Sequence, residues 1–255
     1  MRELFLTDVQ AHIRWIEVPG DGPVRVFLHG LGCTGASDFA HIATHPALRG
    51  GPALLVDLLG YGLSDRPRDF GYGMAAQAAA VARILEHRGA SGAELIGHSM
   101  GGAVAVRLAA ARPDLIARLV VAEPNLYPGG GAFSTPIAAQ DEETFVRQGF
   151  SRMLAVLGRA DYAARLRLSD PLAVHRSAVA LVEGDSPTEG ELLAGLDRPR
   201  AFLVGEYSLP DADAERMRAL GVPVFEVPKA GHNLMIDNPD GFAEELARAL
   251  VVERR

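Results

Sequence analysis

Six short apolar runs, each followed by turn residues and then by a helical pattern, constrain the fold of this chain more than any other feature. They are VRVFLHG from Val24, ALLVDLLG from Ala53, AELIGHS from Ala93, RLVVAEP from Arg118, RAFLVGE from Arg200 and VPVFEVP from Val222. Continuous apolar runs of this length, separated by helices, are typical of parallel strands buried on both faces. The alternation therefore predicts a doubly wound α/β sheet with helices on both faces.

Three further segments carry local signals. Residues 3–22 alternate and turn, which predicts an antiparallel hairpin before the parallel strands. The Ala-rich stretch from Met74 predicts a helix that ends at Gly89 as its C-cap. Near the end of the chain, Pro239 predicts the first position of the last helix, with Asn238 or Asp237 as its cap.

Residues 125–196 break this rhythm, because they contain amphipathic stretches but no strand-like run. We interpret residues 1–124 and 197–255 as the core domain and residues 125–196 as a helical insertion. An insertion at the carboxyl end of a strand would lie over the site that such sheets form there, so we expect it to act as a lid. The alternative is a helical layer with no part in binding.

The motif Gly-x-Ser-x-Gly at residues 97–101 lies between a predicted strand and a predicted helix. Such a turn is so tight that it needs small neighbours, and it projects the serine oxygen above the sheet. Ser99 is therefore the candidate nucleophile. The backbone N–H of Met100, and that of Leu31 in the loop after VFLHG, are the expected donors to an oxyanion.

A serine nucleophile needs a base. Of the eight histidines, His232 is the best candidate, because it follows the last predicted strand at the same end of the sheet as Ser99. His98 and His29 belong to turn motifs instead. Because the base must be neutral, we expect activity to fall at acidic pH.

Four motifs together resemble the α/β-hydrolase fold superfamily over nearly the full length of the chain. They are HGLG at 29–32, DLLGYGLSDRP at 57–67, GHSMGG at 97–102 and AGHNLMIDNPDGF at 230–242. The resemblance implies a mostly parallel eight-stranded α/β-hydrolase sheet with a helical lid. It also implies a Ser-acid-His triad and the hydrolysis of esters or related bonds.

The triad acid departs from the pattern that the resemblance implies. Most relatives have an aspartate where this chain has Ser208, so another carboxylate must take the role. Glu123 is the first choice, because it ends the strand after the nucleophile helix, where haloalkane dehalogenases carry their acid. Asp211 and Glu206 are the alternatives, and Glu123 would then be an exposed loop residue or part of a salt bridge to the lid.

These residues predict a serine hydrolase that cleaves a carboxylic ester or a related small acyl compound through an acyl-enzyme, with no metal and no organic cofactor. A C–C bond hydrolase or a cofactor-free perhydrolase would use the same triad. A non-catalytic receptor for a small ligand on the same fold is the alternative from another class. Six insertion residues are predicted to line an apolar acyl pocket or, equally, to form helix core: Leu126, Tyr127, Phe133, Phe145, Phe150 and Met153.

Composition narrows the class of protein further. The net charge of -7 is dispersed along the chain, which argues against nucleic acid as a partner. A single cysteine, Cys33, excludes an internal disulfide and suits a reducing compartment. We expect neither a signal peptide nor a membrane span, because His98 and Arg107 interrupt the most apolar stretch, and we therefore expect a cytoplasmic protein.

Overall fold

The computed structural model describes residues 1–48 and 50–253 and contains one eight-stranded sheet. Its strand order is β1-β2-β4-β3-β5-β6-β7-β8, and β3 to β8 are parallel to one another. The strands are β1 (Arg2–Leu6), β2 (Ala11–Val18), β3 (Arg25–Leu28), β4 (Ala53–Asp57), β5 (Ala93–His98), β6 (Ile116–Ala122), β7 (Arg200–Gly205) and β8 (Val224–Val227). Five of the six apolar runs contain one parallel strand each, and the run from Arg118 overlaps β6, which begins two residues earlier.

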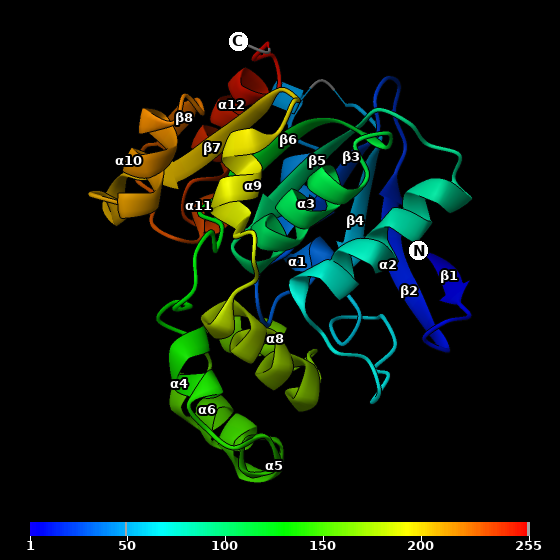
Figure 1. The fold of residues 1–255 in the computed structure, drawn as a ribbon, viewed down its shortest axis with the longest axis vertical. Coiled ribbons are helices and arrows are strands. Elements are labelled where there is room, and N and C mark those ends of the chain that lie inside the picture. Colours follow the sequence, from blue (N-terminus) through cyan, green and yellow to red (C-terminus); the bar gives the residue numbers. More distant parts are fainter. Residues whose placement is uncertain (49, 254–255) are drawn as a thin grey trace.

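The predicted hairpin is present at the start of the chain. β1 and β2 pair antiparallel, and β2 also pairs antiparallel with β4. The hairpin therefore extends the parallel sheet at one edge, which Figure 1 shows in blue. The predicted fold class, a mostly parallel α/β sheet, is confirmed.

Helices cover both faces of the sheet (Figure 1). Those outside the insertion are α1 (Gly35–Ala43), α2 (Met74–His87), α3 (Met100–Ala111), α10 (Ala212–Ala219), α11 (Leu234–Asp237) and α12 (Pro239–Ala249). Phe39 of α1 and Phe242 of α12 belong to one apolar cluster, together with Phe27 of β3. Val81 of α2 and Val104 of α3 belong to the apolar cluster of the opposite face.

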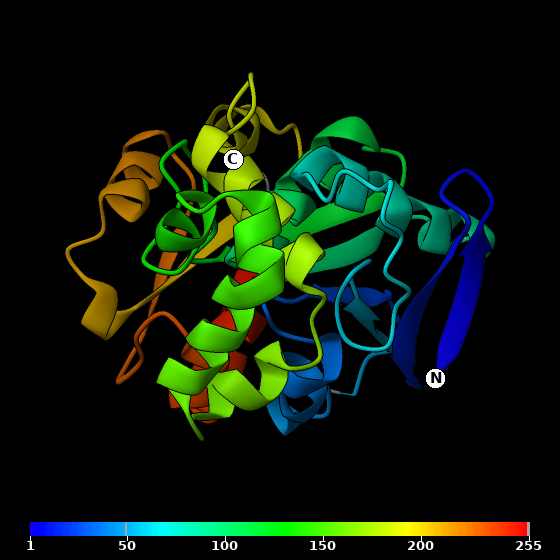
Figure 2. The same cartoon turned by 90° about the horizontal axis from the view of Figure 1, so that it is seen from below.

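The segment between β6 and β7 is helical, as its sequence predicts. It contains α4 (Ser134–Ala138), α5 (Glu142–Thr144), a π-helical turn (Phe145–Gly149), α6 (Phe150–Leu157), α7 (Asp161–Leu166), α8 (Pro171–Glu183) and α9 (Glu189–Gly195). Helices α4 to α8 gather at one end of the molecule, and in the view from below they lie in front of the sheet (Figure 2). Helix α9 instead lies beside α3 and the sheet.

Candidate active site

Ser99 occupies a sharp turn between β5 and α3. Its φ of 52° lies in the left-handed region, where a side chain other than glycine is strained, and such strain is typical of functional sites. The neighbouring glycines make the turn possible. A Cβ on Gly97 would lie 2.3 Å from the carbonyl oxygen of Gly101, and a Cβ on Gly101 would lie 2.3 Å from that of Leu28.

Three residues from three different loops form a chain of hydrogen bonds. Ser99 Oγ lies 3.2 Å from His232 Nε2, and His232 Nδ1 lies 2.7 Å from Glu123 Oε2. These loops follow β5, β8 and β6, whose carboxyl ends lie at one edge of the sheet. A carboxylate on Nδ1 makes that nitrogen the donor and leaves Nε2 free to accept the proton of the serine.

The carboxylate of Glu123 is held on both oxygens. Oε1 accepts a hydrogen bond from the backbone N–H of Gly205 at 2.9 Å, and the side chain of Ser208 also hydrogen bonds to this carboxylate. Burial disfavours the charged form, but the hydrogen bonds from His232, Ser208 and Gly205 outweigh it, so the pKa of Glu123 lies below its usual value. The resemblance implies an aspartate at the position of Ser208. In this chain Ser208 instead contacts the Glu123 carboxylate, which follows β6.

The two alternative acids have other partners. Asp211 Oδ1 accepts a hydrogen bond from the N–H of Ala214 at 2.6 Å and so caps α10. Glu206 Oε2 accepts one from the N–H of Lys229 at 2.7 Å. Within the described part of the chain, neither of these carboxylates hydrogen bonds to His232.

The loop of residues 29–34, which joins β3 to α1, fixes the peptide that carries the Leu31 N–H. The carbonyl of that peptide belongs to Gly30, and it accepts from the ring nitrogen Nδ1 of His29 at 2.8 Å and from the N–H of Cys33 at 3.2 Å. His29 Nε2 accepts from the N–H of Leu58 at 3.1 Å, so the ring proton is on Nδ1. Because a peptide is planar, fixing its carbonyl also fixes the direction of its N–H.

The second expected oxyanion donor lies at the start of α3. Met100 is the first residue of that helix, and its side chain is buried. The first N–H groups of a helix have no acceptor within the helix, so the Met100 N–H is available to a ligand. It directly follows Ser99 in the chain.

Two contacts at the site were not predicted from the sequence. Ser99 Oγ lies 3.4 Å from Asn125 Oδ1 as well as near His232, and His98 Nε2 donates to the backbone carbonyl of His232 at 2.8 Å. Burial, together with the charge of His232, lowers the pKa of His98 to about 4, so its ring is neutral near pH 7. Asn125 follows Glu123 by two positions, and no local pattern marks it.

The six apolar insertion residues have different surroundings. Leu126, Phe145 and Phe150 are buried in the cluster that also contains residues of the sheet, and Met153 packs against that cluster. Tyr127 lines a cavity of about 170 Å³ beside Glu123 and His232, as does Leu126. The ring of Phe133 packs 4.7 Å from the ring of Tyr162.

Among residues 1–48 and 50–253, no group of three or more His, Cys, Asp or Glu side chains is arranged to hold a metal ion. Over the same residues, every helix is too short or too polar to cross a membrane.

Comparison with known proteins gives one family and several relatives. A family model described as "Alpha/beta hydrolase family" matches residues 26–245. The sn-1-specific diacylglycerol lipase ABHD11 of Mus musculus is 29% identical over 260 residues, which cover 89% of this chain and 81% of that protein. Lipase LipV of Mycobacterium tuberculosis is 40% identical over 112 residues, which cover 43% of this chain and only 40% of LipV.

Solved structures show the same fold at low sequence identity. An esterase from Exiguobacterium antarcticum has a TM-score of 0.81 at 20% identity, over 98% of this chain and 99% of that chain. The enol-lactonase from Burkholderia xenovorans LB400 has a TM-score of 0.79 at 19% identity, over 98% of this chain and 100% of that chain.

Proposed function

The chain belongs to the alpha/beta hydrolase family, and from that premise we propose that it is a serine hydrolase that cleaves a carboxylic ester of a small molecule. The hydrogen-bonded chain from Ser99 through His232 to Glu123 is the observation that carries this proposal. The relatives named lipase and esterase support an ester as the substrate class.

The reaction runs through an acyl-enzyme. Ser99 Oγ attacks the carbonyl carbon of the ester while His232 Nε2 takes its proton, and a tetrahedral intermediate forms. The intermediate collapses, and the imidazolium gives the proton to the departing alcohol. A water then attacks the acyl-enzyme with His232 again as base, which releases the carboxylic acid and restores the serine.

A carboxylate and two backbone N–H groups stabilise the charges that develop. Glu123 stays ionised at neutral pH, since its pKa is lowered, and it stabilises the imidazolium through Nδ1. The N–H groups of Leu31 and Met100 donate to the oxyanion of the tetrahedral intermediate. The fixed Gly30–Leu31 peptide supports this role, because a donor that is already oriented costs no reorganisation during the reaction.

The test is a steady-state and burst assay with p-nitrophenyl esters of increasing acyl length on the wild type, Ser99→Ala, Glu123→Gln and the control Asp211→Asn. Ser99→Ala is expected to abolish the burst and nearly all turnover. Glu123→Gln is expected to lower kcat about 10⁴-fold, the cost of replacing the corresponding acid by its amide in the best-studied triad. Asp211→Asn changes a cap of α10 and is expected to leave kcat within a factor of a few.

Two results would contradict the proposal in different ways. Equal losses in Glu123→Gln and Asp211→Asn would remove Glu123 from the role of triad acid. A wild type that turns over no ester would favour a receptor or a narrower chemistry over an esterase.

A further inference from the structure

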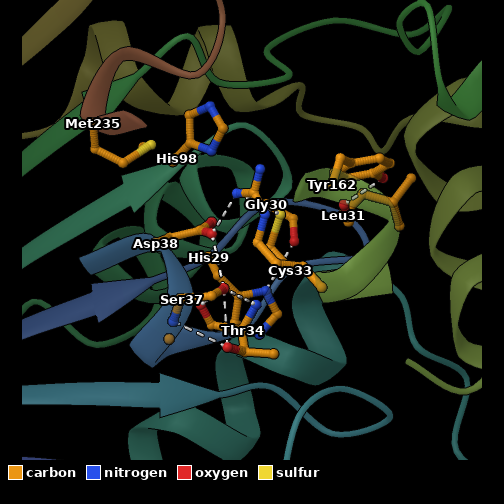
Figure 3. A network of polar contacts seen from close by, with 12 residues as sticks. His29, Gly30, Leu31, Cys33, Thr34, Ser37, Asp38, His98, Tyr162 and Met235 are labelled. Carbon is orange, nitrogen blue, oxygen red and sulfur yellow. Dashed lines mark hydrogen bonds and ion pairs between the residues drawn. The ribbon is translucent and has the colours of Figure 1, made fainter. Parts of the chain in front are cut away.

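Helix α7 of the insertion lies directly against the 29–34 loop. The hydroxyl of Tyr162 donates to the carbonyl of Leu31 at 2.9 Å, and Figure 3 shows the two residues side by side. A Cβ on Gly32 would lie 2.7 Å from both Leu166 Cδ1 and the Tyr162 hydroxyl. The loop and the helix therefore touch with no room for a side chain between them.

A buried ion pair joins the same helix to the core. Arg165 Nη1 lies 2.9 Å from Asp38 Oδ1, and the two side chains are only 11% and 1% exposed. Asp38 lies in the first turn of α1, which begins directly after the loop. Burial raises the pKa of the nearby Cys33 thiol, so Cys33 stays neutral and Asp38 is the charge that Arg165 pairs with.

The peptides on the two sides of Leu31 are held from different parts of the molecule. The core holds the preceding peptide through His29 and Cys33, as described above. The insertion holds the following peptide through Tyr162. The ion pair of Arg165 with Asp38 sets where α7, and with it Tyr162, lies relative to the loop.

We propose that Tyr162 and Arg165 of α7 are positioning residues that hold the Leu31 N–H in place as an oxyanion donor. The inference rests on the proposed function. Such a donor stabilises the oxyanion only within hydrogen-bond distance of where that oxygen forms, and small displacements are costly. The insertion thus contributes to catalysis through the backbone of the core, without touching the reacting atoms.

The chain offers a matched control for the ion pair. Arg107 of α3 and Glu189 of α9 also form a buried pair, at 2.8 Å with side chains 12% and 6% exposed. This second pair likewise joins the 125–196 segment to the core, but Arg107 contacts Glu189, Asp185 and Pro187 rather than the 29–34 loop. Arg107→Met therefore matches Arg165→Met in chemistry and in burial.

The experiment compares Tyr162→Phe, Arg165→Met, Arg165→Lys and Arg107→Met with the wild type. Active sites are counted by titration with a fluorophosphonate, so kcat refers to folded enzyme alone. Affinity for a trifluoromethyl ketone, which forms an oxyanion on the serine, is measured beside kcat and KM. Tyr162→Phe and Arg165→Met are expected to lower kcat about 10-fold to 100-fold. This is no more than the fall in kcat that follows the removal of one complete oxyanion donor.

The other readouts separate positioning from stability. KM is expected to stay within about 3-fold, and the ketone affinity to fall in proportion to kcat, because the oxyanion contact is made in the transition state only. Arg165→Lys restores part of the activity, and Arg107→Met keeps the wild-type kcat. An unchanged kcat in Tyr162→Phe and Arg165→Met, or an equal loss in Arg107→Met, overturns the inference while the esterase proposal stands. An inactive wild type overturns both.

Discussion

At the scale of single residues, His98 holds the backbone of the candidate base, His232, through a hydrogen bond. Its buried ring donates to the backbone carbonyl of His232, and the two rings lie 4.8 Å apart. A second positive charge at this place would repel the imidazolium that forms on His232 during the reaction. The fold avoids that charge, because burial holds the pKa of His98 at about 4.

This lowered pKa predicts a loss of stability in acid. Between about pH 6.5 and pH 4 the unfolded chain protonates His98 while the folded chain does not, so stability falls as the pH falls through that range. The gap between the ordinary value of 6.5 and about 4 corresponds to about 3 kcal/mol. Urea unfolding of the wild type and of His98→Gln at pH 7 and pH 4.5 measures it. Between pH 7 and pH 4.5 the variant is expected to lose less stability than the wild type. Equal losses in the two proteins would contradict a lowered pKa of His98.

Single residues also show how far sequence reasoning reaches. Ser99 was predicted from its Gly-x-Ser-x-Gly turn, and all three of Ser99, His232 and Glu123 lie at or shortly after the end of a predicted strand, where parallel strands bring their carboxyl ends together. Tyr162 and Arg165 carry no such signal, since their partners lie 131 and 127 positions away and nothing local encodes the contact. Side-chain partners across an insertion depend on its packing, which a periodic pattern does not give.

At the scale of elements, the turn from β5 into α3 depends on the close approach of backbone to backbone. A Cβ on Gly97 would meet the carbonyl oxygen of Gly101 at 2.3 Å, and its other near contacts are also backbone atoms, which do not move aside as a side chain can. The tight packing that exposes Ser99 therefore depends on the absence of one methyl group.

Gly97→Ala is accordingly expected to lower the free energy of unfolding by about 3 kcal/mol, at the upper end of the usual cost of overpacking. The control is Gly71→Ala, because a Cβ there meets nothing within 4 Å. That control should stay within about 0.5 kcal/mol of the wild type, or gain slightly from the lower entropy of the unfolded chain. Urea denaturation measures both variants, and a similar change in the two would show that the turn relaxes.

The elements themselves were predicted best where local chemistry defines their ends. Gly89, with a φ of 59°, follows the C-cap of α2, and Asn238 caps α12 by accepting from the N–H of Gly241 at 3.0 Å. The role of the apolar insertion residues could not be predicted in the same way. A hydrophobic stripe suits a core and a pocket equally well, so the sequence left both roles open. Phe145, for example, packs on Phe150 and His175 in the structure.

At the scale of the whole molecule, the 125–196 segment does not pack as one unit. Helix α8 is tied to the core by buried polar contacts: the hydroxyl of Tyr61 donates to Ser177 Oγ at 2.9 Å, and Ser177 Oγ donates to the carbonyl of Tyr72 at 3.1 Å. Helix α6 is more exposed, and the side chain of Val156 is 88% accessible. The boundary predicted at residues 125 and 196 stays a prediction, but the contacts argue for a division inside the segment.

Native-state hydrogen exchange tests this division. Exchange from α8 requires its buried contacts with the core to open, so its free energy of opening is expected to lie within about 1 kcal/mol of the global value. Helix α6 has one buried residue, Phe150, so its amides are expected to exchange at least about 2 kcal/mol below that value through local opening. Helix α3 supplies the global reference, since most of its residues are buried. If α6 and α8 open together well below α3, the insertion unfolds as a separate unit with the boundaries that the sequence suggests. If only α6 opens early, α8 belongs energetically to the core, and independent motion of the insertion is confined to the segment around α6.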